Sequence, residues 1–204
     1  KPEFYAEIWE SIAAFVKIGV IEDDKFAELA KDSIIFETKF DLNKDLNKEI
    51  EGNTLIKKDE KYFTTLLNYK ERNKDFNDKK IIYCTDEISQ SNPLNLWLSN
   101  DREVLKADPL IDAQFIPWLE SKNEDFQFQR VDSEISEDKN DENPEIVDKD
   151  GKSNSDYLKE IISSALDNEK VTIKIQSINN NDAPPALILL PEQMRRINDM
   201  GAFM

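Results

Sequence analysis

Few side chains in this sequence could carry out chemistry on their own. The chain has 204 residues and no histidine, which excludes a Ser-His-Asp triad, a Cys-His pair and a His-ligated metal site built from this chain alone. Its four glycines are too scattered to form a phosphate-binding loop. The acidic cluster at residues 22–24 lacks the separation and the apolar surroundings that tune a general acid and a general base. The sequence therefore predicts that this chain is not an enzyme and has no cofactor or metal of its own.

The remaining composition limits the kinds of partner that the chain can bind and the cell compartments that suit it. The single cysteine, Cys84, lies within an apolar run, which favours a buried and inert thiol. One cysteine cannot form an internal disulfide, and this suits the reducing cytoplasm. The chain carries 43 acidic and 27 basic residues, a formal charge of −16, so we expect no nucleic-acid binding through a broad basic face. No apolar run approaches the roughly 20 residues needed to cross a bilayer, so we expect no membrane partner.

The side chains best suited to binding lie near the C-terminal end. Met194, Ile197 and Met200 recur at helical spacing and place apolar, flexible groups on one face of a helix that begins at Pro191. Methionine is unbranched and adapts to irregular surfaces, so an exposed face of this kind suits the binding of varied partners. The alternative is that these side chains pack on the apolar residues 186–190, or on helices that would follow Met204 in a longer protein.

Helical spacing dominates the first 70 residues. An apolar stripe predicts a helix over residues 4–16 that ends at Gly19, and a shorter helix follows around residues 26–30. Residues 41–60 are polar and predict a loop or an insertion, and helical spacing resumes at Tyr62 and Phe63. Trp9 is expected in the core because it lies in an apolar stripe.

An alternating pattern of strands and helices follows. The predicted strands are residues 80–85, 104–105 and 126–131, and the predicted helices are residues 92–100 and 111–121. Such an order predicts a small parallel sheet with right-handed crossovers. Trp97 is expected in its core.

The composition shifts again after Asp132. Residues 132–156 are acidic and poor in large apolar groups, so they predict a flexible linker between two domains. Beyond it we expect one helix, two strands and a last helix, over residues 157–166, 171–175, 186–190 and from 191 onwards. The predicted fold class is α/β, and α+β overall. Its parts are a helical connector, a small α/β subdomain with a short and mostly parallel sheet, an acidic linker and the start of a further domain (residues 1–70, 71–132, 133–155 and 156–204).

Four stretches resemble the heat-shock protein 90 family of molecular chaperones, in its bacterial form. They are FYAEIWESIAAFVKIGVIEDDKFAELAK, KKIIYCTDE, VLKADPLIDAQFIPWLE with FQFQRVDSE, and DAPPALILLPEQMRRINDM. The resemblance depends on their shared order and spacing rather than on any single motif. It implies a piece of a longer chaperone, running from the later middle domain into the C-terminal domain.

The resemblance carries expectations about partners. It implies binding of unfolded or partly folded client proteins through the last helix and through an exposed face of the helix at residues 111–121, including the positions of Ala113, Gln114 and Pro117. In that helix Gln114 takes the family's aromatic position, while Phe115 and Trp118 supply the bulk; Trp118 is also a candidate core residue. ATP, magnesium and a homodimer are expected of the whole chaperone, whose nucleotide site and dimer helices lie outside this segment. Arg102 is expected to be a solvated loop residue rather than the family's phosphate-contacting arginine.

A second hypothesis remains open from the residues alone. The chain could be a small α/β ligand-binding or enzyme domain that uses the carboxyl ends of its parallel strands. Residues 89–92, which follow the first predicted strand, would line such a crevice. A purely structural interaction module is a third reading.

Overall fold

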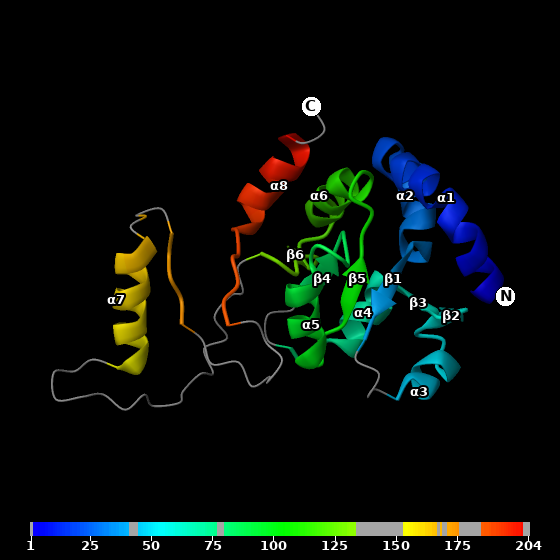
Figure 1. Ribbon diagram of the computed structural model, residues 1–204. Helices are drawn as coiled ribbons and strands as arrows, with labels where there is room; N and C mark the ends of the chain where they lie inside the picture. Colours follow the sequence, from blue (N-terminus) through cyan, green and yellow to red (C-terminus); the bar gives the residue numbers. More distant parts are fainter. Residues whose placement is uncertain are drawn as a thin grey trace. The chain divides into compact units, whose positions relative to one another are not determined.

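The computed structural model describes residues 2–40, 45–76, 80–133, 153–166, 168, 171–175 and 185–201 (Figure 1). The helices are α1 (Pro2–Glu22), α2 (Asp24–Ala30), the 3-10 turn η1 (Lys31–Ser33), α3 (Leu46–Glu51), α4 (Leu66–Arg72), α5 (Ser91–Ser99), α6 (Asp112–Lys122), α7 (Asn154–Leu166) and α8 (Glu192–Gly201). The strands are β1 (Ile35–Lys39), β2 (Ile56–Lys58), β3 (Lys61–Thr65), β4 (Ile81–Cys84), β5 (Val104–Lys106) and β6 (Phe128–Arg130).

The chain divides into two compact units. The first, here called the sheet unit, comprises residues 1–136 and 184–204; the second, the α7 unit, comprises residues 137–183. The predicted domain boundaries at residues 70, 132 and 155 stay predictions.

A single mixed sheet organises the sheet unit. Its strand order is β2-β3-β1-β5-β4-β6. β4 pairs in parallel with β5 on one side and with β6 on the other, which confirms the predicted parallel arrangement. β1 pairs antiparallel with β5 and β3, and β3 pairs antiparallel with β2. The mixed α/β class is therefore confirmed, but the sheet as a whole is not mostly parallel, because the N-terminal segment adds three antiparallel strands.

These three strands correct the prediction for the N-terminal segment. Residues 41–60, expected to be a loop or an insertion, contain α3 and β2. Tyr62 and Phe63, expected in a helix, lie in β3. β2 and β3 form a hairpin whose register pairs Lys58 with Lys61, and Asp59 in its turn has φ of 53°. Aspartate tolerates this left-handed conformation, so the turn closes without glycine.

The first helix also runs further than its sequence indicates. α1 continues through Gly19 to Glu22 rather than ending at a glycine cap. A Cβ at position 19 would lie 3.1 Å from the Phe26 ring. Gly19 therefore serves the close approach of α2 to α1 rather than the end of the helix.

Apolar side chains cover both faces of the sheet. On one face, α1, α2 and α6 pack against residues that include Tyr83 and Phe128. On the other face, α5 packs against Ile82, Cys84, Val104 and Val131. Trp9 and Trp97 are both buried, as predicted. Successive residues of β4 thus point to opposite helical layers, which is the period-two alternation of a strand covered on both sides.

A buried polar network joins the antiparallel strands to the parallel ones. Glu103, which has no exposed surface, accepts hydrogen bonds from Thr38, Arg72 and Asn73 at 2.7 to 3.1 Å. Its neighbour Arg102 is also buried, with its guanidinium 4.1 Å from the centre of the Phe76 ring. The expectation that Arg102 is solvated is therefore wrong, because cation–π contact and burial hold it in the core.

The C-terminal predictions are confirmed for the helices and not for the strands. α7 and α8 form where predicted. Residues 171–175 carry no strand, and in residues 186–190 only Leu190 pairs, through a single parallel bridge to Ser133. An alternating or apolar sequence is compatible with a strand, but a strand also needs a neighbour to pair with. Most of the predicted linker, residues 134–152, lies outside the described residues.

Candidate functional site

The two helices that the sequence singles out for binding, α6 and α8, contact each other in the sheet unit. A bidentate ion pair joins them near the end of α6. The Arg196 guanidinium donates to the two carboxylate oxygens of Glu120 at 2.6 and 3.1 Å. Figure 1 shows the two helices side by side, with β6 close to both. Paired geometry of this kind fixes orientation as well as distance.

Glu192, at the start of α8, anchors that helix to the sheet. Its carboxylate accepts hydrogen bonds from the Tyr83 hydroxyl at 3.0 Å, the Arg130 backbone N–H at 3.1 Å and the Arg196 Nε at 2.9 Å. An acidic residue in the first helical turn also interacts favourably with the helix dipole. A further ion pair joins Arg195 to Asp132 at 3.0 Å. α8 therefore docks on β4, β6 and α6 through its charged residues.

The surroundings of these groups shift their pKa values in consistent directions. Burial acts to raise the pKa of Glu192, but the hydrogen bonds from Arg196 and from the Arg130 N–H outweigh it and lower the pKa. Burial acts to lower the pKa of Arg196, and its bonds to Glu120 and Glu192 outweigh that effect and raise it. Burial, followed by the charge of Glu192, raises the pKa of Tyr83. Glu192 and Arg196 are thus held in their charged forms.

The apolar residues of α8 lie on its opposite side. Met194 has 56% and Ile197 68% of its surface exposed. Residues 192, 195 and 196 share one helical face, and residues 194 and 197 share the other. Met200 lies in α8, but its side chain is outside the described part of the structure. The reading in which Met194 and Ile197 pack on residues 186–190 does not hold for these two side chains.

In α6 the structure separates the candidate residues. Gln114 and Pro117 are exposed. Phe115 has no exposed surface and belongs to the core, so it cannot contribute to an exposed binding face. Trp118 is partly buried and stacks on Phe115, with ring centres 5.8 Å apart. Pro117 lacks an N–H, so the carbonyl of Ala113 does not receive the usual helical hydrogen bond.

A buried ion pair sets the position of α6 against α1. The Lys17 ammonium donates to both carboxylate oxygens of Asp112, at 2.7 and 2.9 Å. The ammonium also lies 4.4 Å from the centre of the Phe36 ring. Burial raises the pKa of Asp112, and the Lys17 charge and the Asp108 N–H act in the opposite direction. Since Asp112 is the first residue of α6, this pair fixes where the helix begins.

The ligand-binding hypothesis places residues 89–92 in a crevice at the carboxyl ends of the parallel strands, and residues 89, 91 and 92 are exposed there. Gln90, expected to line it, is buried. Its amide oxygen accepts from the Thr85 backbone N–H at 2.8 Å, and its amide nitrogen donates to Asp132 at 3.1 Å. Glu192 covers the end of β6 as described above. These polar groups hold the loops after β4 and β6 together with α8.

Other potential reactive groups are accounted for by the fold. Cys84 is fully buried, and burial, with the nearby Glu87 charge next in size, raises its pKa to about 11. Across the described residues no group of three histidine, cysteine, aspartate or glutamate side chains could hold a metal ion. Within the same residues, no helix has the length and apolar character to span a membrane.

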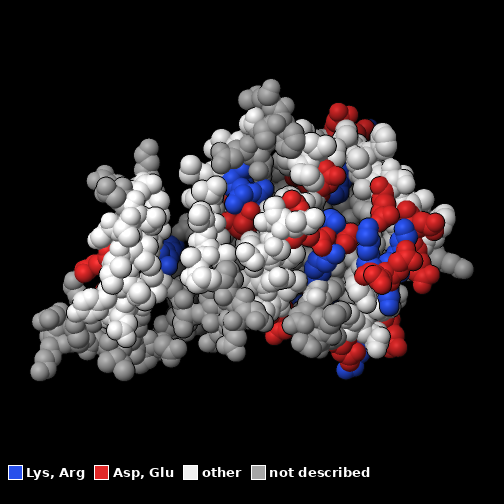
Figure 2. Space-filling view, viewed as in Figure 1, with Lys and Arg blue, Asp and Glu red and all other residues white. Residues whose placement is uncertain are grey.

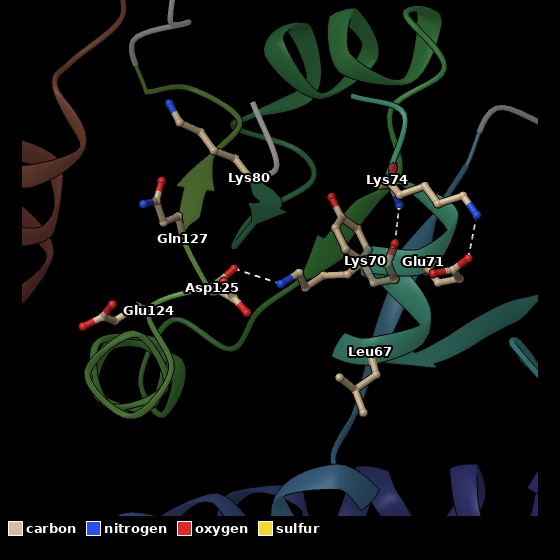
Figure 3. Close-up of a pocket in the computed structure, with 10 residues that line it drawn as sticks. Leu67, Lys70, Glu71, Lys74, Lys80, Glu124, Asp125 and Gln127 are labelled. Carbon is tan, nitrogen blue, oxygen red and sulfur yellow. Dashed lines mark hydrogen bonds and ion pairs between the residues drawn. The ribbon is translucent and has the colours of Figure 1, made fainter. Parts of the chain in front are cut away.

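A pocket of about 590 Å³ lies at the amino ends of β4 and β6. Figure 3 shows its charged lining: Lys70 points toward Asp125, and Lys74 points toward Glu71. Lys70 donates to the Asp125 carbonyl oxygen at 3.0 Å, and Lys74 pairs with Glu71 at 2.7 Å. Because the lining combines three lysines with Glu71, Glu124 and Asp125, it favours no single class of ligand.

Charges of both signs are mixed on the face of the molecule shown in Figure 2. On the face shown in Figure 2, lysine and arginine lie among aspartate and glutamate rather than in one basic field. Met194 and Ile197 add an exposed apolar side of α8 to the surface of the sheet unit.

Comparison with known proteins gives one informative match. No protein-family model matches this chain. The chain is 25% identical over 212 residues to the chaperone protein HtpG of Bacteroides thetaiotaomicron, in an alignment that covers 97% of this chain and 27% of that protein. The similarity thus extends over nearly the whole chain, which spans 27% of the length of the relative.

Proposed function

We propose that this chain is a segment of a chaperone of the heat-shock protein 90 family and that it contributes to the binding of non-native client proteins. The similarity to HtpG over 97% of the chain supports the family. The ATP and magnesium chemistry and the dimer of such a chaperone belong to the parts of the protein beyond this segment. We assign no nucleotide chemistry to the residues present here, and a cytoplasmic location stays a prediction.

The orientation of α8 is the observation that carries the client-binding proposal. An amphipathic surface helix usually packs its apolar side on the core and leaves its charged side in water. α8 does the reverse: Glu192 and Arg196 contact the sheet and α6, while Met194 and Ile197 face the solvent. Exposed apolar side chains on α8 suit the capture of irregular apolar segments.

The proposal is tested by the ability of the chain to slow the aggregation of heat-unfolding citrate synthase, followed by light scattering. We expect suppression by the wild-type chain and its loss in the double variant Met194→Ser and Ile197→Ser. The matched control is Ile88→Ser, because Ile88 is 87% exposed and lies on the loop after β4. This control should suppress aggregation like the wild type. Absence of suppression by the wild-type chain at tenfold molar excess, or equal loss in the control, would contradict the proposal.

A further inference from the structure

The outer edge of β6 is the end of the sheet on the parallel side. In its ladder with β4, the Gln127 carbonyl accepts from Ile81 N–H and the Val131 N–H donates to the Tyr83 carbonyl, both at 2.8 Å. Backbone groups of a strand alternate in direction, so those of the even-numbered residues, Phe128 and Arg130, point away from β4. Two N–H groups and two carbonyl groups therefore face outward.

Side chains supply most of the partners of these outward groups. The Phe128 N–H donates to Glu120 at 2.8 Å, and its carbonyl accepts from Arg196 at 3.3 Å. The Arg130 N–H donates to Glu192 at 3.1 Å. The Arg130 carbonyl accepts from the Ser133 N–H at 2.9 Å. Two of the four partners come from α8, one from α6 and one from the chain just after β6.

This arrangement takes the place of a further strand. An open strand edge is a ready template for another chain, and proteins cover such edges to prevent unwanted pairing. Here carboxylate oxygens stand where an added strand would present carbonyls, and a guanidinium stands where it would present an N–H. The Glu120–Arg196–Glu192 triad thus holds α8 in place and closes the edge with the same side chains.

The chain itself indicates what fits beside this edge. Leu190 forms a parallel bridge with Ser133, which follows the turn at residues 131–132 after the end of β6. The preceding residues, 186–189, are apolar and non-helical, and Ile188 is 89% exposed. One apolar residue, Leu190, therefore already pairs in the parallel sense with the chain just after β6.

We propose that the outer edge of β6 is a binding site for an extended apolar segment of a non-native polypeptide, which adds to the sheet as a parallel strand when α8 withdraws Glu192 and Arg196. Main-chain hydrogen bonds would provide affinity with little dependence on sequence. The inference rests on the proposed client binding and names the form in which a client segment is held.

The experiment uses the full chain and a fluorescein-labelled peptide of alternating valine and threonine residues with a lysine at each end. The substitution Arg196→Ala removes the cap on the Phe128 carbonyl and loosens α8, and Glu192→Gln is a milder second opening. Fluorescence anisotropy should show at least tenfold tighter peptide binding by Arg196→Ala than by the wild type. Circular dichroism and thermal unfolding of each variant check that it remains folded.

A second substitution tests whether binding uses the backbone. In the Arg196→Ala background, Arg130→Pro removes an outward N–H while the bonds of Gln129 and Val131 to β4 remain, as proline permits on an edge strand. Arg130→Ala is the matched control, since it removes the same side chain and keeps the N–H. The proline variant should lose the tenfold gain and the alanine variant should keep it. Equal binding by the two would overturn the inference.

Hydrogen exchange at the Phe128 and Arg130 amides separates the remaining outcomes. We expect these amides to exchange faster in Arg196→Ala and to regain protection when peptide is added. Protection that returns without peptide would mean that residues 186–190 have taken the edge, and the inference would be wrong. If the Met194 and Ile197 substitutions abolish aggregation suppression but Arg130→Pro leaves it unchanged, the edge site is wrong and the proposed function still holds. Loss of all client binding would instead contradict the proposed function.

Discussion

The buried pair of Lys17 and Asp112 allows a quantitative test of how α6 is positioned. The side chains are 7% and 1% exposed, so neither charge has water to replace its partner. Asp112→Ala would leave the Lys17 ammonium buried beside the Phe36 ring and would also remove the acceptor of the Asp108 N–H. Removing one partner of a buried ion pair costs about 3–5 kcal/mol. For a unit of this size that corresponds to a fall in Tm of roughly 6–20 °C.

Urea unfolding followed by circular dichroism measures the free energy of unfolding of Asp112→Ala and Lys17→Ala. Each should lose about 3–5 kcal/mol. The double variant Lys17→Met and Asp112→Leu replaces both charges by apolar groups and should lie within about 2 kcal/mol of the wild type. Two results would refute the view that a buried unpaired charge causes the loss of stability. One is a loss below about 1 kcal/mol in the single variants, and the other is a loss in the double variant equal to the sum of the two single losses.

Two further outcomes follow from shifted pKa values. The pKa of Glu192 is lower in the folded chain than its usual value of 4.5. Its contribution to stability is therefore complete above pH 4.5 and is lost as the pH falls through the lowered pKa. NMR resonances of the Tyr83 ring should report release of α8 only on such acidification. Burial raises the pKa of Cys84 from 9.0 to about 11, so thiol labelling with Ellman's reagent at pH 8 should be slower by about 100-fold or more than in urea. Equally rapid labelling without urea would show that Cys84 is accessible in the native chain.

The parallel part of the sheet could be predicted because its signals are local and strong. β4 is a buried apolar run between charged residues, and α5 and α6 carry clear helical spacing. β1 escaped prediction because Glu37 and Lys39 interrupt its apolar character, although both lie at partly buried positions next to neighbouring strands. The hairpin of β2 and β3 lacks the glycine that usually marks such a turn.

The candidate site could be predicted as a pair of helices but not as a geometry. Helical spacing places Met194 and Ile197 on one face, yet it does not say whether that face meets the core or the solvent. Phe115 and Gln114 are neighbours in sequence, and only the packing of α6 on the sheet separates the buried side chain from the exposed one. Glu192 and Arg196 are four residues apart, a spacing common to exposed ion pairs that contribute little stability, so nothing in the sequence indicates an anchor there.

The exposure of Met194 and Ile197 and the closure of the β6 edge have a common physical cause. Burying both side chains would gain about 3–6 kcal/mol. An apolar face turned inward, however, would remove the α8 partners of the Phe128 carbonyl and the Arg130 N–H, at about 1–3 kcal/mol for each group, and would leave Glu120 without its arginine. The orientation that turns the charged face of α8 inward is therefore the more stable one as long as the outward backbone groups of β6 need hydrogen-bond partners. Once an added strand supplies them, that constraint disappears and α8 is free to turn its apolar side toward the bound segment. Edge occupancy and helix orientation are then linked equilibria, in which each favours the other by the same free energy.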